Sequence, residues 1–206
     1  MTQPKAPWAA RTARAGRDHE TRTLLLECAE RVFARLGYAR ATIADITAEA
    51  KVARATFYVY FASKENVFRA VAARVRDAFL AAHDFPGVED PYTLARDSIA
   101  AFLTAHARHH QLMTVIEHQA LADPEIAQTW TEIRERPLRR TTRYVERLTA
   151  QGKADPAAPP RSIAEAAYGM IVQFARIIDA DPTAFDAAVN DVTAMYLRLL
   201  SPRNTT

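Results

Sequence analysis

The residues best suited to specific chemistry lie in one short segment, Arg54-Ala55-Thr56-Phe57-Tyr58-Val59-Tyr60. Arg54 can donate two hydrogen bonds to guanine O6 and N7, while Thr56 and Tyr58 can reach phosphate or base edges. Ala55 is small enough to approach a base or a thymine methyl group. These groups predict non-covalent recognition of a duplex by a surface helix. On pattern alone, an ordinary aromatic core helix is an equally good interpretation.

Histidines form a second group of reactive side chains, at His106, His109, His110 and His118. His106 and His110 are four residues apart, so one face of a helix could bring both to a zinc or nickel ion. The favoured interpretation is a set of polar-core or surface histidines, and no metal site is predicted.

A run of arginines follows between residues 134 and 147, interleaved with glutamates. The arginines are Arg134, Arg136, Arg139, Arg140, Arg143 and Arg147, and the glutamates are Glu132, Glu135 and Glu146. Because the two signs alternate, the run predicts a solvated, ion-paired helix face rather than a second nucleic-acid site.

Enzyme chemistry is not indicated. The chain lacks a nucleophile elbow, a Glu-x-x-His di-iron pattern and a Gly-rich phosphate loop. Cys28, the only cysteine, adjoins an apolar helix stripe and is expected in the core, so neither a disulfide nor a cysteine-based zinc site is predicted. There is no secretory signal and no apolar run long enough to span a bilayer, and a cytoplasmic protein without membrane contact is expected.

The elements that must position these side chains are all helical. Apolar residues from Leu25 to Leu36 form one helical stripe, and Gly37 is a suitable stop. Thr42 and Asp45 form a capping-box start for a helix ending near Ala50, and a second short helix would cover residues 54–60. Ser63 would cap a helix from about 64 to 82 that connects the two halves of the chain.

Five more helices are expected, at about 91–108, 111–121, 124–152, 161–178 and 182–200. Asp90, Asp123 and Asp181 each precede a proline, an arrangement typical of helix N-termini. Pro137 should kink or break the third of these helices.

Charge is uneven along the chain. Residues 1–64 hold 11 Lys and Arg against 6 Asp and Glu, whereas residues 65–206 hold 16 against 18. The first part therefore has a balance of +5 and the second of −2, which suits a phosphate partner at the N-terminal end. A soluble basic arm without a partner would have the same charge.

The stretch from Thr42 to Phe61, continuing Ala62-Ser63-Lys64-Glu65, resembles the DNA-binding domain of the tetracycline-repressor (TetR) family of bacterial regulators, over residues 22–80. The resemblance implies an all-α fold in which a homeodomain-like, three-helix helix-turn-helix precedes a helical ligand-binding and dimerisation bundle. The corresponding boundaries are a flexible basic arm at 1–20, the helix-turn-helix at 21–64 and the bundle at 65–201. The implied function is a homodimeric repressor that binds palindromic operator DNA at the nucleoid and is released by an unknown small-molecule effector, with no required cofactor. The alternatives are a related regulator gated by a metal ion and a helical ligand-binding protein that does not bind DNA.

By position, the resemblance implies a set of DNA-contacting residues: Thr42, Lys51, Arg54, Ala55, Thr56, Tyr58, Val59, Tyr60 and Lys64. Arg11, Arg14 and Arg17 could reach a phosphate or the minor groove, or belong to a solubilising tail. Lys51 stands where the family usually has glycine, at a turn that needs a left-handed backbone, and Ala53 replaces a common serine.

The resemblance also places a ligand cavity among the helices of residues 91–152 and a four-helix dimer interface on the last two helices. The expected cavity wall consists of Phe79, Phe102, His106, Met113, Ile116, Trp130, Ile133 and Tyr168. The expected interface consists of Ile163, Met170, Ile171, Phe174, Val189, Val192, Tyr196 and Leu199. For both sets, packing within one subunit is the alternative.

Overall fold

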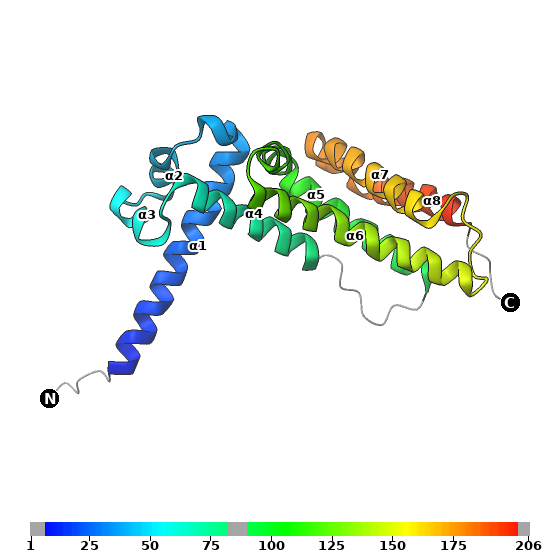
Figure 1. Cartoon of the computed structure of the whole chain (residues 1–206), viewed down its shortest axis with the longest axis horizontal. Helices are drawn as coiled ribbons and strands as arrows, with labels where there is room; N and C mark the ends of the chain where they lie inside the picture. The colour runs from blue at the N-terminus through cyan, green and yellow to red at the C-terminus, as the bar shows by residue number, and fades with distance from the viewer. Residues whose placement is uncertain (1–6, 82–89, 202–206) are drawn as a thin grey trace. The chain divides into compact units, whose positions relative to one another are not determined.

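A computed structural model describes residues 7–81 and 90–201, with side chains in the first helix from Asp18 onward. Its described elements confirm the all-α class (Figure 1). They are α1 (Pro7–Arg40), α2 (Ile43–Ala50), α3 (Arg54–Tyr60), α4 (Lys64–Ala81), α5 (Pro91–Ala120), α6 (Pro124–Ala150), α7 (Pro160–Ala180), the 3₁₀ turn η1 (Pro182–Ala184) and α8 (Phe185–Leu200). Every helix in the described segments is too short or too polar to cross a lipid bilayer.

The chain divides into two compact units, residues 1–72 and 73–206, and α4 runs without interruption through the boundary. In the first unit, α1 begins at Pro7, so the arm predicted for residues 1–20 is wrong from that residue onward. Its alanine and arginine content favours helix over coil. The residues before Pro7, and the side chains of Arg11, Arg14 and Arg17, lie outside the described part.

The core of the first unit forms where the periodicity predicts. Val32, Phe33, Phe57 and Phe68 are buried, and the rings of Phe33 and Phe68 meet edge to face, with centroids 4.9 Å apart. Gly37 interrupts α1 with a φ of +73°, a backbone angle that glycine adopts without strain. One further turn reaches Arg40 and leads into α2.

The second unit packs α5, α6, α7 and α8 around a shared core (Figure 1). The predicted capping carboxylates are confirmed, since Asp90, Asp123 and Asp181 each accept backbone N–H bonds. Asp181 caps η1, a turn that the sequence interpretation had merged with α8.

Two expected interruptions in the second unit are wrong. The helices predicted at 91–108 and 111–121 are one helix, α5, because no residue between them breaks a helix. Pro137 does not break α6, which continues from Pro124 to Ala150. Proline removes a single backbone donor, and the buried Pro137 ring gains apolar contact that offsets this loss.

Candidate nucleic-acid interface and internal cavity

The first helix of the predicted helix-turn-helix, α2, begins with a complete capping box. The Thr42 hydroxyl accepts from the Asp45 N–H at 3.1 Å and donates to Asp45 Oδ2 at 2.6 Å, while the Thr42 N–H donates to the same carboxylate at 2.9 Å. These bonds from Thr42 lower the pKa of the Asp45 carboxyl. Since both donors of Thr42 are occupied, the phosphate contact predicted for it would have to replace one of these bonds.

The turn after α2 has the left-handed backbone that the family resemblance implies for this position. Lys51 adopts φ 54° and ψ 41°, and its N–H donates to Ala48 O at 3.2 Å. The N–H of Val52 donates to Thr47 O at 3.1 Å, which closes the end of the helix. The Lys51 side chain is exposed, as a phosphate contact needs.

The second helix, α3, is anchored by one face and open on the other. Phe57 and Phe61 are buried, as predicted from their spacing. Tyr58 is 48% exposed and Val59 is 74% exposed. Such exposure of large apolar side chains on a seven-residue helix indicates a surface that binds a partner molecule.

Arg54 and Tyr58 form a pair on this open face. Arg54 Nη2 donates to the Tyr58 hydroxyl at 3.3 Å, and the guanidinium carbon lies 5.8 Å from the ring centroid. Both side chains are exposed, as is Ala55 between them. The pair lies on one face because the two residues are four apart in a helix. A bidentate donor next to a second polar group is what base-edge recognition needs.

Three other residues predicted to contact DNA are less exposed or already hydrogen-bonded within the protein. Thr56 is half-buried. Tyr60 is half-buried, and its hydroxyl donates to Asp18 Oδ1 of α1 at 3.2 Å, so a DNA contact by this hydroxyl would have to replace that bond. Lys64 Nζ donates to Tyr38 O at 3.0 Å and to Ala41 O at 3.2 Å, and lies 4.5 Å from the Tyr38 ring centroid. Lys64 therefore closes the end of α1, with one N–H left for a phosphate.

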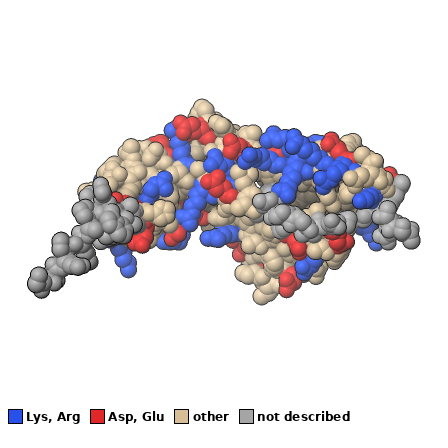
Figure 2. Space-filling view, turned by 90° about the horizontal axis from the view of Figure 1, so that it is seen from below, with Lys and Arg blue, Asp and Glu red and all other residues tan. Residues whose placement is uncertain are grey.

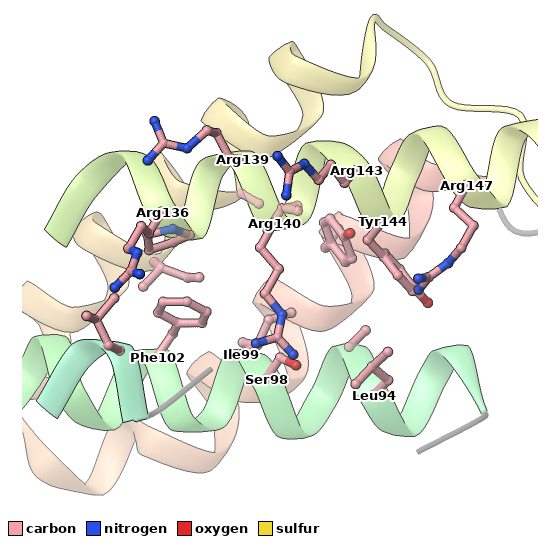
Figure 3. Close-up of a pocket in the computed structure, with 17 residues that line it drawn as sticks. Leu94, Ser98, Ile99, Phe102, Arg136, Arg139, Arg140, Arg143, Tyr144 and Arg147 are labelled. Carbon is pink, nitrogen blue, oxygen red and sulfur yellow. The ribbon is translucent and has the colours of Figure 1, made fainter. Parts of the chain in front are cut away.

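The second unit contains a cavity of about 750 Å³ between α5, α6, α7 and α8 (Figure 3), and Leu80 of α4 is also among its lining residues. Ile99, Ile171 and Tyr196 form buried parts of its wall, and arginines of α6 form its other side. Its volume suits a small organic ligand.

Of the cavity residues predicted from the sequence, Phe102 lines this space and the other seven do not. Phe79 and His106 instead pack edge to face at 4.6 Å, and the Tyr168 ring lies 5.6 Å from the imidazole. Burial raises the pKa of Tyr168 to about 12. Met113, Ile116 and Ile133 are buried core residues and Trp130 is half-buried. The sequence signal that was missed is the inner face of the arginine run.

Comparison with known proteins finds similarity to one family of regulators. Residues 25–71 match the family model described as bacterial regulatory proteins, tetR family. The HTH-type transcriptional regulator EthR of Mycobacterium tuberculosis is 26% identical over 208 residues, which cover 95% of each chain. The N-terminal region of the chain thus matches the tetR family, and the whole chain is similar to EthR. The residues matched by the model run from α1 into α4 and include the whole helix-turn-helix.

Several solved structures share the fold. A TetR-like transcriptional regulator from Rhodococcus sp. RHA1 superposes with a TM-score of 0.69 at 24% identity, over 86% of this chain and 94% of the other. A second tetR-family protein from Rhodococcus RHA1 gives 0.72 at 20% identity, over 89% and 98%. GusR of Salmonella enterica gives 0.68 at 17% identity, over 88% and 96%. These likenesses, at 24% identity or less, show that the chain shares the fold of these proteins.

Most of the residues predicted to form a TetR-type dimer interface are buried within their own subunit. Ile163, Val189 and Val192 are at most 2% exposed, and Ile171 and Tyr196 are 6% exposed, all within the core of their own subunit. Met170, Phe174 and Leu199 are partly buried against the same core. The broad apolar faces of α7 and α8 thus serve folding, because the two helices pack on α5 and on each other.

The outer face of these two helices is different in character. It carries small residues, Ala166, Gly169 and Ala194, together with the partly exposed Ile177 and Met195. Small residues let two helices approach closely. This stripe was missed because its apolar content is low.

Metal chemistry receives no support from the described residues, which contain no group of three or more potential metal-binding side chains. His106 is buried beside Phe79 and Tyr168, whereas His110 is half-buried. Cys28 is buried as predicted, and burial raises the pKa of its thiol.

Proposed function

We propose that this TetR-family regulator represses transcription by binding a palindromic operator as a homodimer, and that a small molecule held in the cavity of the C-terminal unit releases it. The observation that carries the proposal is the open face of α3, where Arg54, Ala55, Tyr58 and Val59 are exposed while Phe57 is buried. Val59 is 74% exposed next to the 48% exposed Tyr58, and a helix in the major groove can place such an apolar side chain against a thymine methyl group.

The division of roles follows from the contacts of each side chain. Arg54 reads base edges with its guanidinium, and Tyr58 holds it through the 3.3 Å hydrogen bond. Lys51, exposed at the turn, pairs with a phosphate. Lys64 fixes the end of α1 and offers its remaining N–H to the backbone of the duplex.

A dimer is supported by the outer stripe of α7 and α8. Gly169 lies in the interior of α7, where glycine costs about 1 kcal/mol relative to alanine. A Cβ atom at Gly169 would meet nothing within 4 Å in the described part of its own chain. Close approach of a second copy explains this glycine, and two-fold symmetry would present two recognition helices to one palindrome.

Release by a ligand requires a difference in affinity between two conformations of the protein. The cavity wall includes Leu80, which belongs to the same continuous helix, α4, as Lys64. A ligand that favours a different position of Leu80 would act on the helix whose first residue holds the end of α1. The free energy for release comes from this preference and not from affinity as such.

The test is binding of the full chain to duplexes from its own upstream region and to scrambled duplexes, at several salt concentrations, together with sedimentation equilibrium. We expect a dimer with a preference for one palindrome, and a log–log salt slope of about 0.9 per phosphate contact. Equal binding to all duplexes, or a monomer at the concentrations that saturate DNA, would contradict the proposal. A cavity ligand that leaves DNA affinity unchanged would contradict the release step.

A further inference from the structure

One side of the cavity in the C-terminal unit carries an unusual density of positive charge. Five arginines of α6 line it, and their positions share one helix face: Arg136, Arg139, Arg140, Arg143 and Arg147. Figure 2 shows Lys and Arg side chains gathered along this part of the second unit. Such a cluster raises the local concentration of anions.

Two of the glutamates that alternate with these arginines form ion pairs with arginines outside the cavity. Glu132 pairs with Arg76 at 3.4 Å, and Glu135 accepts from Arg161 at 3.0 Å. Within the described residues, none of the five cavity arginines forms an ion pair. The ion-paired helix face expected from the sequence is therefore wrong for this side of α6, and its charges are available to a ligand.

The arginines differ in direction, as Figure 3 shows. Arg140 extends across the cavity to Ser98 and Ile99 of α5, and Arg136 points toward Phe102. Arg147 lies beside Tyr144, with its guanidinium carbon 5.4 Å from the ring centroid. Arg139 turns away from α5. A guanidinium that spans the space beside a serine hydroxyl forms a binding point for an oxyanion.

The wall of the cavity also has apolar, buried parts. Ile99 is 5% exposed and Ile171 is 6% exposed, and Tyr196 closes the same region. Burial raises the pKa values of Tyr144 and Tyr196, so both hydroxyls stay protonated and can donate. A ligand that fits both parts must have an anionic end and an apolar body.

We infer that the effector is an amphipathic organic anion, whose carboxylate or phosphate group binds Arg140 between Arg136 and Arg147 and whose apolar part lies against Ile99 and Ile171. The inference rests on the proposed role of this cavity as the effector site. It adds the chemical class of the ligand and the residue that selects it. Both headgroups offer the planar or tetrahedral oxygens that match a guanidinium fork.

The test is isothermal titration calorimetry of the full chain with decanoate, decyl phosphate, decanol and inorganic phosphate. These probes separate the two headgroups, the apolar chain alone and the headgroup alone. Arg140→Gln removes the central charge, and Arg108→Gln is the matched control, since it makes the same charge change on an exposed side chain of α5 that does not line the cavity. Thermal unfolding of each variant shows that it is folded.

We expect at least one of the two amphipathic anions to bind tenfold or more tightly than decanol, with the better one identifying the headgroup. Arg140→Gln should reduce this preference at least fivefold, and Arg108→Gln should preserve it. Equal binding of anion and alcohol, equal binding of inorganic phosphate and decyl phosphate, an equal loss in the Arg108 variant or no binding by any probe would each overturn the inference. Calorimetry needs no DNA, so a parallel measurement of operator binding by the same samples tests the proposed function separately.

Discussion

Two positively charged residues of the first unit, Arg54 and Lys64, differ in exposure and in hydrogen bonding. Arg54 is exposed and bonds to Tyr58 within its own helix. Lys64 is partly buried and bonds to two backbone carbonyls at the end of α1. A charged group that is hydrogen-bonded within the protein contributes to the stability of the fold, whereas an exposed charged group is available to bind a partner.

Arg54→Ala should therefore reduce sequence preference without unfolding the protein. The loss of a bidentate guanine contact should weaken specific binding by about 1–3 kcal/mol and leave non-specific binding nearly unchanged. Affinity for a library of single-base operator variants measures the effect, which should concentrate at one position of each half-site. Arg108→Ala, an exposed arginine of α5, is the charge-matched control. An unchanged preference profile would remove Arg54 from base recognition.

Lys64→Ala should act on stability as well as on DNA. Losing two hydrogen bonds from a charged donor should lower the free energy of unfolding by about 1–2 kcal/mol. Urea denaturation without DNA measures this loss, and binding to all duplexes should weaken alike. If the urea midpoint is unchanged while DNA affinity falls, Lys64 is a phosphate contact only.

At this scale, exposure of Arg54 and burial of Phe57 could be predicted from spacing, because both follow from one helix period. The partners of Lys64 and Tyr60 could not. They belong to residues more than 20 positions earlier, and one set consists of backbone carbonyls that carry no sequence signal.

At the scale of elements, α2 is held at both ends by local chemistry. Its start has the reciprocal bonds of Thr42 and Asp45, and its end has Lys51 in a left-handed conformation. A non-glycine residue in that conformation is strained by about 1 kcal/mol. The capping bonds at the start of α2 therefore stabilise the helix, whereas the left-handed residue at its end destabilises it.

Lys51→Gly should raise the free energy of unfolding, by about 0.5–1 kcal/mol, because glycine adopts the left-handed backbone without strain. The opposite sign is expected for Ala48→Gly, an exposed position inside the same helix, where glycine costs about 1 kcal/mol. Thermal or urea unfolding without DNA compares the two variants. Destabilisation by both would show that the Lys51 side chain makes a stabilising contact.

The capping box should make stability depend on pH. The pKa of Asp45 is lowered in the folded protein by the Thr42 bonds, so its carboxylate stabilises the fold above its ordinary pKa, about 3.9, and this contribution disappears as the pH falls through the folded-state value. Asp45→Asn should therefore differ most from the parent protein near pH 6 and converge with it in acid. Urea midpoints from pH 6 to pH 2.5 measure this difference. In a Thr42→Ala background the difference should shrink, and a pH-independent difference would contradict the capping role.

Helix starts were predictable because capping aspartates and prolines act on adjacent backbone groups. The continuity of α5 and α6 was not. Whether Pro137 interrupts a helix depends on what packs around its ring, and the packing of α6 against α5 and α7 is a tertiary contact that the local sequence around Pro137 does not encode.

At the scale of the whole molecule, the apolar positions of α7 and α8 could pack either in the core of one subunit or against a second subunit. The periodicity of α7 and α8 predicts a wide apolar face but not which surface covers it. The structure assigns Val189 and Val192 to the subunit core and leaves a thinner outer stripe around Gly169, Ile177 and Met195. A surface of small residues carries little hydrophobic signal, so the sequence pattern favoured the more apolar face as the dimer interface.

Ile177→Glu tests whether that outer stripe joins two copies of the chain. Ile177 is 43% exposed, so a carboxylate there is solvated in a monomer, whereas at a two-fold interface it would be desolvated close to its symmetry mate. We expect sedimentation equilibrium to show a shift from dimer to monomer, and palindromic operator binding to weaken at least tenfold as the second recognition helix is lost. Leu121→Glu, at an 88% exposed position beyond the end of α5, is the control and should remain dimeric. If the Ile177 variant keeps both its dimer and its operator affinity, the copies must meet through another surface.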